Sequence, residues 1–69
     1  MNIFVEIDSA FTRLHFITPE VEKELPALGA RKDVDGWLLP ANKMGAFLAV
    51  ASRLGFEVYT FSGSRVIPD

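Results

Sequence analysis

The chain has 69 residues, with seven Lys and Arg against nine Asp and Glu, and no cysteine. This length suits one domain, so we expect residues 1–69 to form a single unit, and the missing cysteines exclude disulfides and thiolate metal sites. With 49% hydrophobic residues and a net charge of −2, the composition is that of a folded domain without an overall positive charge for binding nucleic acid or anionic lipid.

Residues 2–18 have the pattern of a β-hairpin. Apolar residues occupy every second position in two short runs, namely Ile3, Val5 and Ile7, then Leu14 and Phe16. Alternation with period two is typical of strands that bury one face. We therefore expect these five residues to face the core, which leaves Phe4 on the other side of the sheet.

Residues 18–29 carry the signals of a short helix. Thr18 can cap the start, and Pro19 suits the first helical position. Pro26 limits the helix because it removes a backbone donor and crowds the preceding turn. We expect a kinked or two-part helix that ends at Gly29.

The second half of the chain predicts a strand, a helix and two further strands. An Asp-Gly turn at 33–36 precedes a strand over 36–40, and a helix runs from a cap at Asn42 to Leu54. Strands follow over 56–61 and 65–67. The apolar residues of the helix form one stripe of Met44, Phe47, Leu48, Ala51 and Leu54. The order β-β-α-β-α-β predicts an α+β domain, in which two helices pack on one face of a mixed sheet of about four or five strands.

Little in the chain suggests catalysis. A nucleophilic site needs a nucleophile, a base and an orienting group together, and His15 is the single histidine. We expect His15 to make a polar contact on the open face of the sheet. The acidic residues of the 33–36 turn lack the further ligands of a calcium loop. The expected protein is therefore not an enzyme and binds neither cofactor nor metal.

An aromatic face of the sheet is the expected site for a protein partner. In the later strand, either Phe56, Val58 and Thr60 or Glu57, Tyr59 and Phe61 face away from the helices. In the second case Tyr59 and Phe61 join Phe4, and an uncovered aromatic face is typical of an interaction surface. Glu20 and Glu24, four residues apart, can add negative charge at its rim. The predicted partner-binding residues are Phe4, His15, Glu20, Glu24, Tyr59 and Phe61.

An alternative is a nucleic-acid site. Its candidate residues are Arg13, Arg31, Lys32 and Arg65. If these side chains meet near His15, they form a local basic patch beside aromatic rings that can stack on bases.

Three segments carry a resemblance to a known family. They are LPALGARKD at 25–33, GWLLP at 36–40 and LGFEV at 54–58. This stretch resembles HARP-like modules, which occur beside Swi/Snf-type annealing helicases and in phage and plasmid proteins. Lys32 stands where that family usually has an aromatic residue. Membership implies a role near branched or single-stranded DNA.

From the small size and this resemblance, we expect a phage or mobile-element protein that binds and modulates a host protein. The host protein that we expect is an enzyme acting on nucleic acid. A homodimer is a further expectation, because small domains without disulfides often need another source of stability. The chain shows neither a basic segment followed by an apolar leader core nor an apolar run of membrane-spanning length. We therefore expect a cytoplasmic protein without membrane contact.

Overall fold

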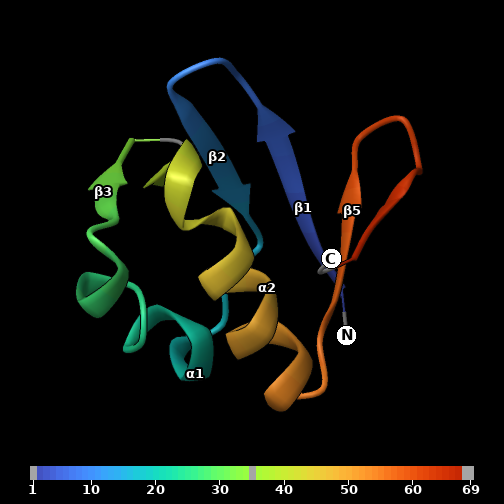
Figure 1. Ribbon diagram of the computed structural model, residues 1–69. Helices are drawn as coiled ribbons and strands as arrows, with labels where there is room; N and C mark the ends of the chain where they lie inside the picture. The colour runs from blue at the N-terminus through green and yellow to red at the C-terminus, as the bar shows by residue number, and fades with distance from the viewer. Residues whose placement is uncertain (1, 35, 68–69) are drawn as a thin grey trace.

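The computed structural model describes residues 2–34 and 36–67. Within these ranges the chain forms one six-stranded mixed sheet in the order β3-β4-β2-β1-β5-β6 (Figure 1). The strands are β1 (Asn2–Ile7), β2 (Phe11–His15), β3 (Arg31–Asp33), β4 (Gly36–Pro40), β5 (Glu57–Thr60) and β6 (Arg65–Val66). The helical segments are α1 (Pro19–Glu22), the 3-10 turns η1 (Pro26–Leu28) and η2 (Ala41–Lys43), and α2 (Met44–Arg53). The predicted α+β class with a single mixed sheet is confirmed, with slightly more strands than expected.

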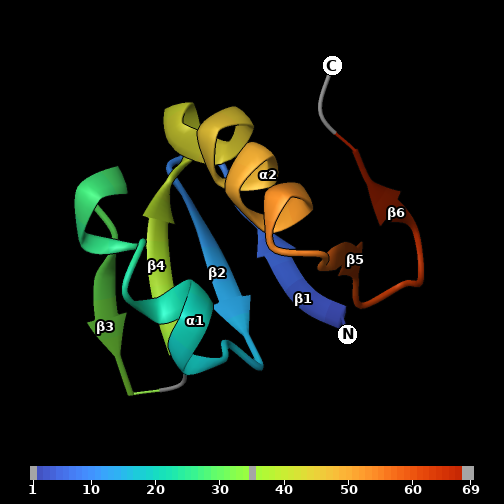
Figure 2. The same ribbon diagram turned by 90° about the horizontal axis from the view of Figure 1, so that it is seen from below.

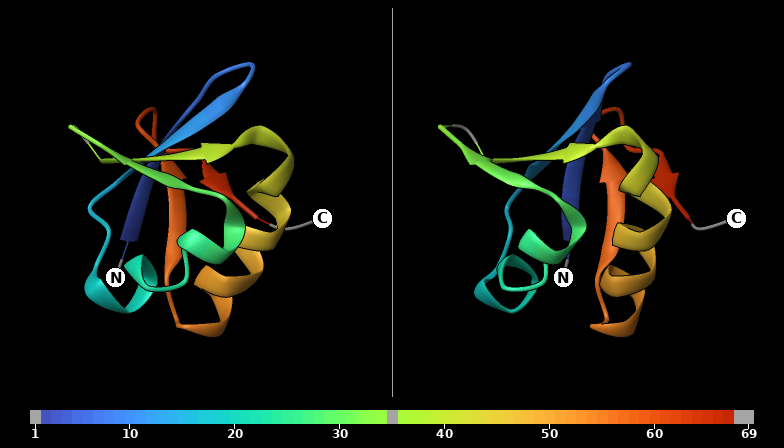
Figure 3. Two further views of the ribbon diagram at one scale, coloured as in Figure 1. Left: turned by 90° about the vertical axis from the view of Figure 1, so that its left-hand side faces the viewer. Right: turned by 60° about the vertical axis from the view of Figure 1, so that its left-hand side comes forward.

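Strand β1 is central to the topology. It pairs antiparallel with β2, where Val5 lies opposite Leu14, and parallel with β5, where Val5 lies opposite Thr60. Strand β4 pairs antiparallel with β2 and so runs in the same direction as β5. Parallel strands need a crossover connection, and α2 provides it by passing over β2 and β1 (Figure 2). The sheet is strongly twisted, so that β4 and β1 cross at a steep angle in Figure 3.

The core lies between the sheet and the helices. The sheet contributes Ile3, Val5, Leu14, Leu39 and Val58, and the helical layer contributes Val21, Leu25, Phe47, Leu48 and Ala51. The predicted stripe of the second helix is confirmed, since its central members are buried and Met44 and Leu54 pack beside them. Thr12 is also buried, because it lies opposite Leu39 on the core face.

Two expectations for the first hairpin are wrong. Ile7 is 61% exposed, because β1 extends past the helical layer at this point. Phe16 is 70% exposed, because β2 ends at His15 and the backbone of Phe16 adopts a positive φ of 61°. This conformation breaks the alternation that would have put Phe16 beside Leu14.

The connections also differ in detail from the sequence prediction. Strand β3 was not expected, since its three residues are all charged and show no apolar alternation. The second helix begins at Met44 after the 3-10 turn, with Lys43 rather than Asn42 at the cap position. The first helix is in two parts and ends at a left-handed Gly29, as predicted. Thr18 occupies the cap position, but its side chain makes no capping hydrogen bond.

Candidate functional site

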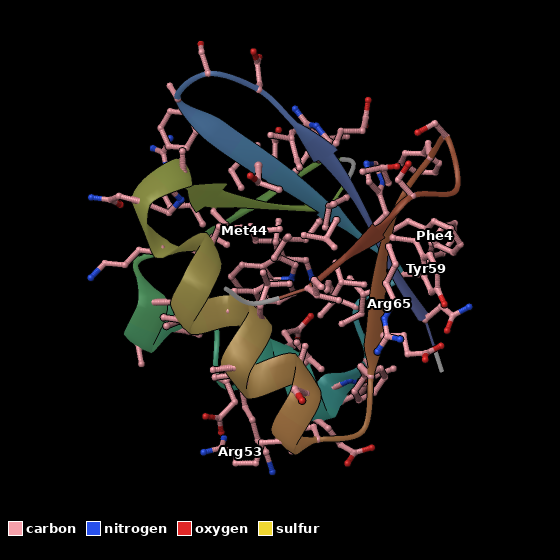
Figure 4. The ribbon with its side chains drawn as sticks, turned by 45° about the vertical axis from the view of Figure 1, so that its right-hand side comes forward. Phe4, Met44, Arg53, Tyr59 and Arg65 are labelled. Atoms are coloured by element: carbon pink, nitrogen blue, oxygen red, sulfur yellow. The ribbon has the colours of Figure 1, made fainter. Side chains whose placement is uncertain are left out.

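The sheet face opposite the helices carries a cluster of rings that we call the aromatic patch. It consists of Phe4, His15, Phe16, Tyr59 and Phe61. The ring of Phe4 lies at its centre, with centroids 5.6 Å from Phe61, 5.8 Å from Phe16 and 6.2 Å from Tyr59. The ring of His15 lies 4.9 Å from that of Phe61. Figure 4 shows Phe4 and Tyr59 together on the side of the sheet away from α2.

Strand register explains how most of these rings meet. Phe4 lies directly opposite His15 on one side and Tyr59 on the other. Residues opposite one another on paired strands share a face of the sheet, so the three side chains are neighbours. Phe61 follows Tyr59 by two positions and returns to the same face. The structure thus brings together four of the six residues that the sequence proposed for partner binding.

Phe16 was missed as a member of the aromatic patch. Its ring stands edge-on to Phe4, with an interplanar angle of 83°. A left-handed backbone at a bulky residue is uncommon and costs about 1–2 kcal/mol. The pattern of apolar residues does not indicate a positive φ. The alternation along β2 therefore predicted the wrong face of the sheet for Phe16.

The two predicted rim acids lie elsewhere. Glu20 is exposed on α1, in the helical layer, and Glu24 pairs with Arg53 of α2 at 3.2 Å. Both are therefore on the opposite side of the molecule from the aromatic patch. Helix α1 ends at Glu22, and the chain continues through tighter turns with bonds between residues three apart. Glu20 and Glu24 therefore do not share one face of an α-helix, as the sequence prediction assumed.

Glu6 and Glu57 are the acids that border the aromatic patch. The Glu6 carboxylate Oε1 lies 2.7 Å from His15 Nε2. The Glu57 carboxylate accepts a hydrogen bond from the Tyr59 hydroxyl at 3.1 Å and lies 3.6 Å from the Arg65 guanidinium. The hydrogen bond to Glu57 raises the pKa of Tyr59 above its ordinary value of 10.0, with desolvation acting in the same direction.

The predicted basic residues do not form one patch. Arg31 and Arg65 lie on β3 and β6, which are the opposite edges of the sheet. Lys32 lies opposite Trp37 and faces the helical layer, 4.0 Å from Glu22. The sheet order separates these side chains, and this order cannot be read from local sequence patterns.

Arg13 lies on the aromatic face of the sheet beside a carboxylate. Its guanidinium donates to Asp33 at 2.9 Å. This hydrogen bond, together with that from the Val34 backbone N–H, lowers the pKa of Asp33. Arg31 extends over the ring of Phe11, with the guanidinium carbon 6.0 Å from the ring centroid.

The surface is hollowed where β1 and β5 end. We call this feature the strand-end hollow. It has a volume of about 620 Å³ and is lined by Val5, Glu6, Ile7, Thr60, Phe61 and Ser62. Phe61 therefore borders both the hollow and the aromatic patch, which makes the two features continuous.

The described residues place no group of three or more His, Asp or Glu side chains where they could hold a metal ion. In residues 2–34 and 36–67, no helix combines the length and apolar character needed to cross a membrane. No protein-family model matches the chain, and no match was found among curated proteins or solved structures. The likeness to HARP-like modules therefore stays a prediction.

Proposed function

We propose that this protein is a small non-enzymatic interaction module that binds a partner protein through the aromatic patch. The observation that carries the proposal is Phe16. Its backbone adopts a costly left-handed conformation, and the result is a large apolar ring that is 70% exposed beside Phe4. Strain at an exposed position is typical of a functional surface, because folding alone gains little from it.

The composition of the aromatic patch supports a protein partner. Phe61 is 56% exposed and stacks on Phe4, which is half-buried. A partner can therefore contact the exposed rings of Phe61 and Phe16, both of which pack on Phe4. Aromatic side chains are enriched at the energetic centres of protein interfaces. The acids at the border, Glu6 and Glu57, can set the orientation of the partner.

The biological role that we propose is occlusion of a working surface on a host protein, by a phage or mobile-element product in the cytoplasm. The host protein would be an enzyme that acts on nucleic acid. Direct binding of DNA through Arg13, Arg31, Lys32 and Arg65 has less support. A phosphate backbone is bound by several cations in one region, and Arg31 and Arg65 lie at opposite edges of the sheet.

A pull-down of the tagged full-length protein from bacterial lysate tests this function. The experiment compares the wild type with Phe16→Ala, Phe61→Ala and Val34→Ala, each with and without nuclease. Val34 is a suitable control because it is 94% exposed in the turn after β3, outside the aromatic patch. We expect one dominant protein to survive nuclease with the wild type and Val34→Ala, and to be lost with both phenylalanine variants.

Two outcomes would overturn the proposed function. Prey that disappear after nuclease would point to nucleic-acid binding. Prey retained by folded Phe16→Ala and Phe61→Ala proteins would show that binding does not use the aromatic patch. Circular dichroism of each variant establishes that the fold survives, as expected for side chains that lie outside the core.

A further inference from the structure

Strand β1 is longer than the neighbour with which it pairs on one side. Its parallel register with β5 ends where Val5 lies opposite Thr60, whereas β1 continues to Ile7. Strand β5 stops there because the chain turns back, with Thr60 Oγ1 at 2.8 Å from Ser62 Oγ and accepting from the Ser64 N–H at 3.2 Å. Among the described residues, no strand is paired with Ile7 on the β5 side.

The backbone of Ile7 is directed toward this side. In an antiparallel pair, successive residues point their N–H and C=O groups alternately toward and away from the partner strand. Asp8 donates its N–H to the Phe11 carbonyl at 3.0 Å, so Asp8 is directed toward β2. Ile7, one residue earlier, therefore points its N–H and C=O away from β2 and toward the strand-end hollow.

The side chains around this edge are apolar and acidic. Ile7 and Phe61 are both more than half exposed and line the strand-end hollow. Glu6 is the one charged side chain among its six lining residues. Glu6, Ile7 and Asp8 also line a second hollow of about 220 Å³, together with Arg13, which already pairs with Asp33.

We infer that the strand-end hollow receives an extended basic segment of the partner protein, which adds a short strand along Ile7. This inference rests on the proposed function and names the chemistry of its partner. Strand addition at an open edge combines backbone hydrogen bonds with pockets for alternate side chains. Apolar side chains of the segment pack on Ile7, and the intervening Lys or Arg side chains lie on the other face of the sheet, where they meet Glu6 and Asp8 beside Phe61. The volume of the hollow lies within the range of about 300–1,000 Å³ that is typical of binding pockets.

Selection from a displayed library of random short peptides against the full-length protein tests the inference. We expect enriched peptides to alternate apolar residues with Lys or Arg. A synthetic peptide of the enriched sequence should lose about tenfold or more in affinity for Ile7→Lys. The matched control is Val34→Lys, which adds the same charge at an exposed apolar position outside the hollow and should bind as the wild type does.

A second pair of variants examines the backbone edge. Among the backbone hydrogen-bonding groups, Ile7→Pro removes only an N–H that points away from β2, and proline is tolerated at such edge positions. Ile7→Val keeps this N–H and a similar side chain. We expect peptide affinity to fall for Ile7→Pro and to be largely kept for Ile7→Val.

The outcomes separate this inference from the proposed function. Enrichment of acidic peptides, no enrichment, or equal affinity for Ile7→Lys and wild type would overturn the strand-addition site. If the selected peptides bind through Phe16 and are insensitive to Ile7 variants, the aromatic patch remains the binding surface and the inference fails. If they depend on Ile7 and are unaffected by Phe16→Ala, the inference stands and the proposed aromatic patch fails.

Discussion

The ring of Phe16 stands edge-on to the ring of Phe4 at a centroid distance of 5.8 Å, although the two residues belong to strand positions that alternation assigns to opposite faces. The positive φ of Phe16 brings this contact about. The backbone at this one residue therefore adds an exposed ring to the aromatic patch, at a cost in conformational energy.

Replacement of Phe16 separates stability from binding. In Phe16→Gly the left-handed backbone no longer costs about 1–2 kcal/mol. Against this gain stand the lost ring contact with Phe4, worth about 0.5–1.5 kcal/mol, and the greater entropy of glycine in the unfolded chain. We expect the free energy of unfolding to change by less than about 1 kcal/mol in urea titration, while partner binding is lost.

A β-branched residue provides the contrasting variant. Phe16→Val retains the left-handed cost and loses the ring contact, so it should be less stable than Phe16→Gly by about 1 kcal/mol once the entropy of glycine in the unfolded chain is subtracted. Equal stabilities for the two variants would show that Phe16 is not strained, and would remove the main support for the proposed function.

Gly36 of β4 lies against the backbone of β2. Its φ is +143°, and a Cβ at this position would lie 2.3 Å from the Leu14 carbonyl oxygen. Since the clash is with backbone, Gly36→Ala should lower the free energy of unfolding by about 2 kcal/mol or more. Gly45→Ala is the matched control, because nothing lies within 4 Å of its Cβ position in α2.

The control should move in the opposite direction. Alanine favours a helix over glycine by up to about 1 kcal/mol, so Gly45→Ala is expected to raise the midpoint of thermal unfolding. A destabilisation of similar size in both variants would contradict the close approach of β4 to β2.

The period-two pattern predicted the position of Phe4 and the shared face of Tyr59 and Phe61, but left open which face of the sheet that is. Phe4 was assigned to the face away from the helices because Ile3 and Val5 had to face the core, and Tyr59 and Phe61 share one face of their own strand. Local spacing shows which residues of one strand share a face. The register of β1 with β5 then brings Phe4 beside Tyr59 and Phe61.

The acidic border and the distribution of basic residues could not be predicted in the same way. Both depend on which strands are neighbours. Glu57 became part of the patch because β5 pairs parallel with β1, and Arg31 was separated from Arg65 because β3 and β6 are the outer strands. Strand order is decided by long-range packing of the whole core, and short segments carry no signal for it.

The ion pair between Arg13 and Asp33 predicts a pH dependence of stability. Asp33 has an ordinary pKa of 3.8, which the Arg13 hydrogen bond lowers in the folded protein. A carboxyl with a lowered folded pKa stabilises the fold fully above its unfolded pKa, and this contribution is lost as the pH falls through the folded value. Wild type should therefore be more stable than Asp33→Asn at neutral pH, and the difference should shrink below pH 3.8.

Urea titrations of both proteins across this range measure the effect, and their difference cancels the titration of other carboxyls. In an Arg13→Gln background the difference should already be small at neutral pH, as in a double-mutant cycle. A difference that is constant from neutral pH to below 3.8 would contradict the assigned cause.

Tyr59 is the single tyrosine of the chain, so its ionisation can be followed directly by ultraviolet absorbance. The Tyr59 hydroxyl donates to the Glu57 carboxylate, and this bond favours the protonated phenol and raises its pKa above 10.0. Glu57→Gln removes the negative charge but keeps a side-chain oxygen as acceptor, so the pKa of Tyr59 should fall toward 10.0. The nearby Arg65 acts in the opposite direction, and Arg65→Gln should therefore raise the pKa of Tyr59 further. If both variants titrate as the wild type does, Tyr59 and Glu57 are not bonded in solution, and Glu57 does not order this border of the aromatic patch.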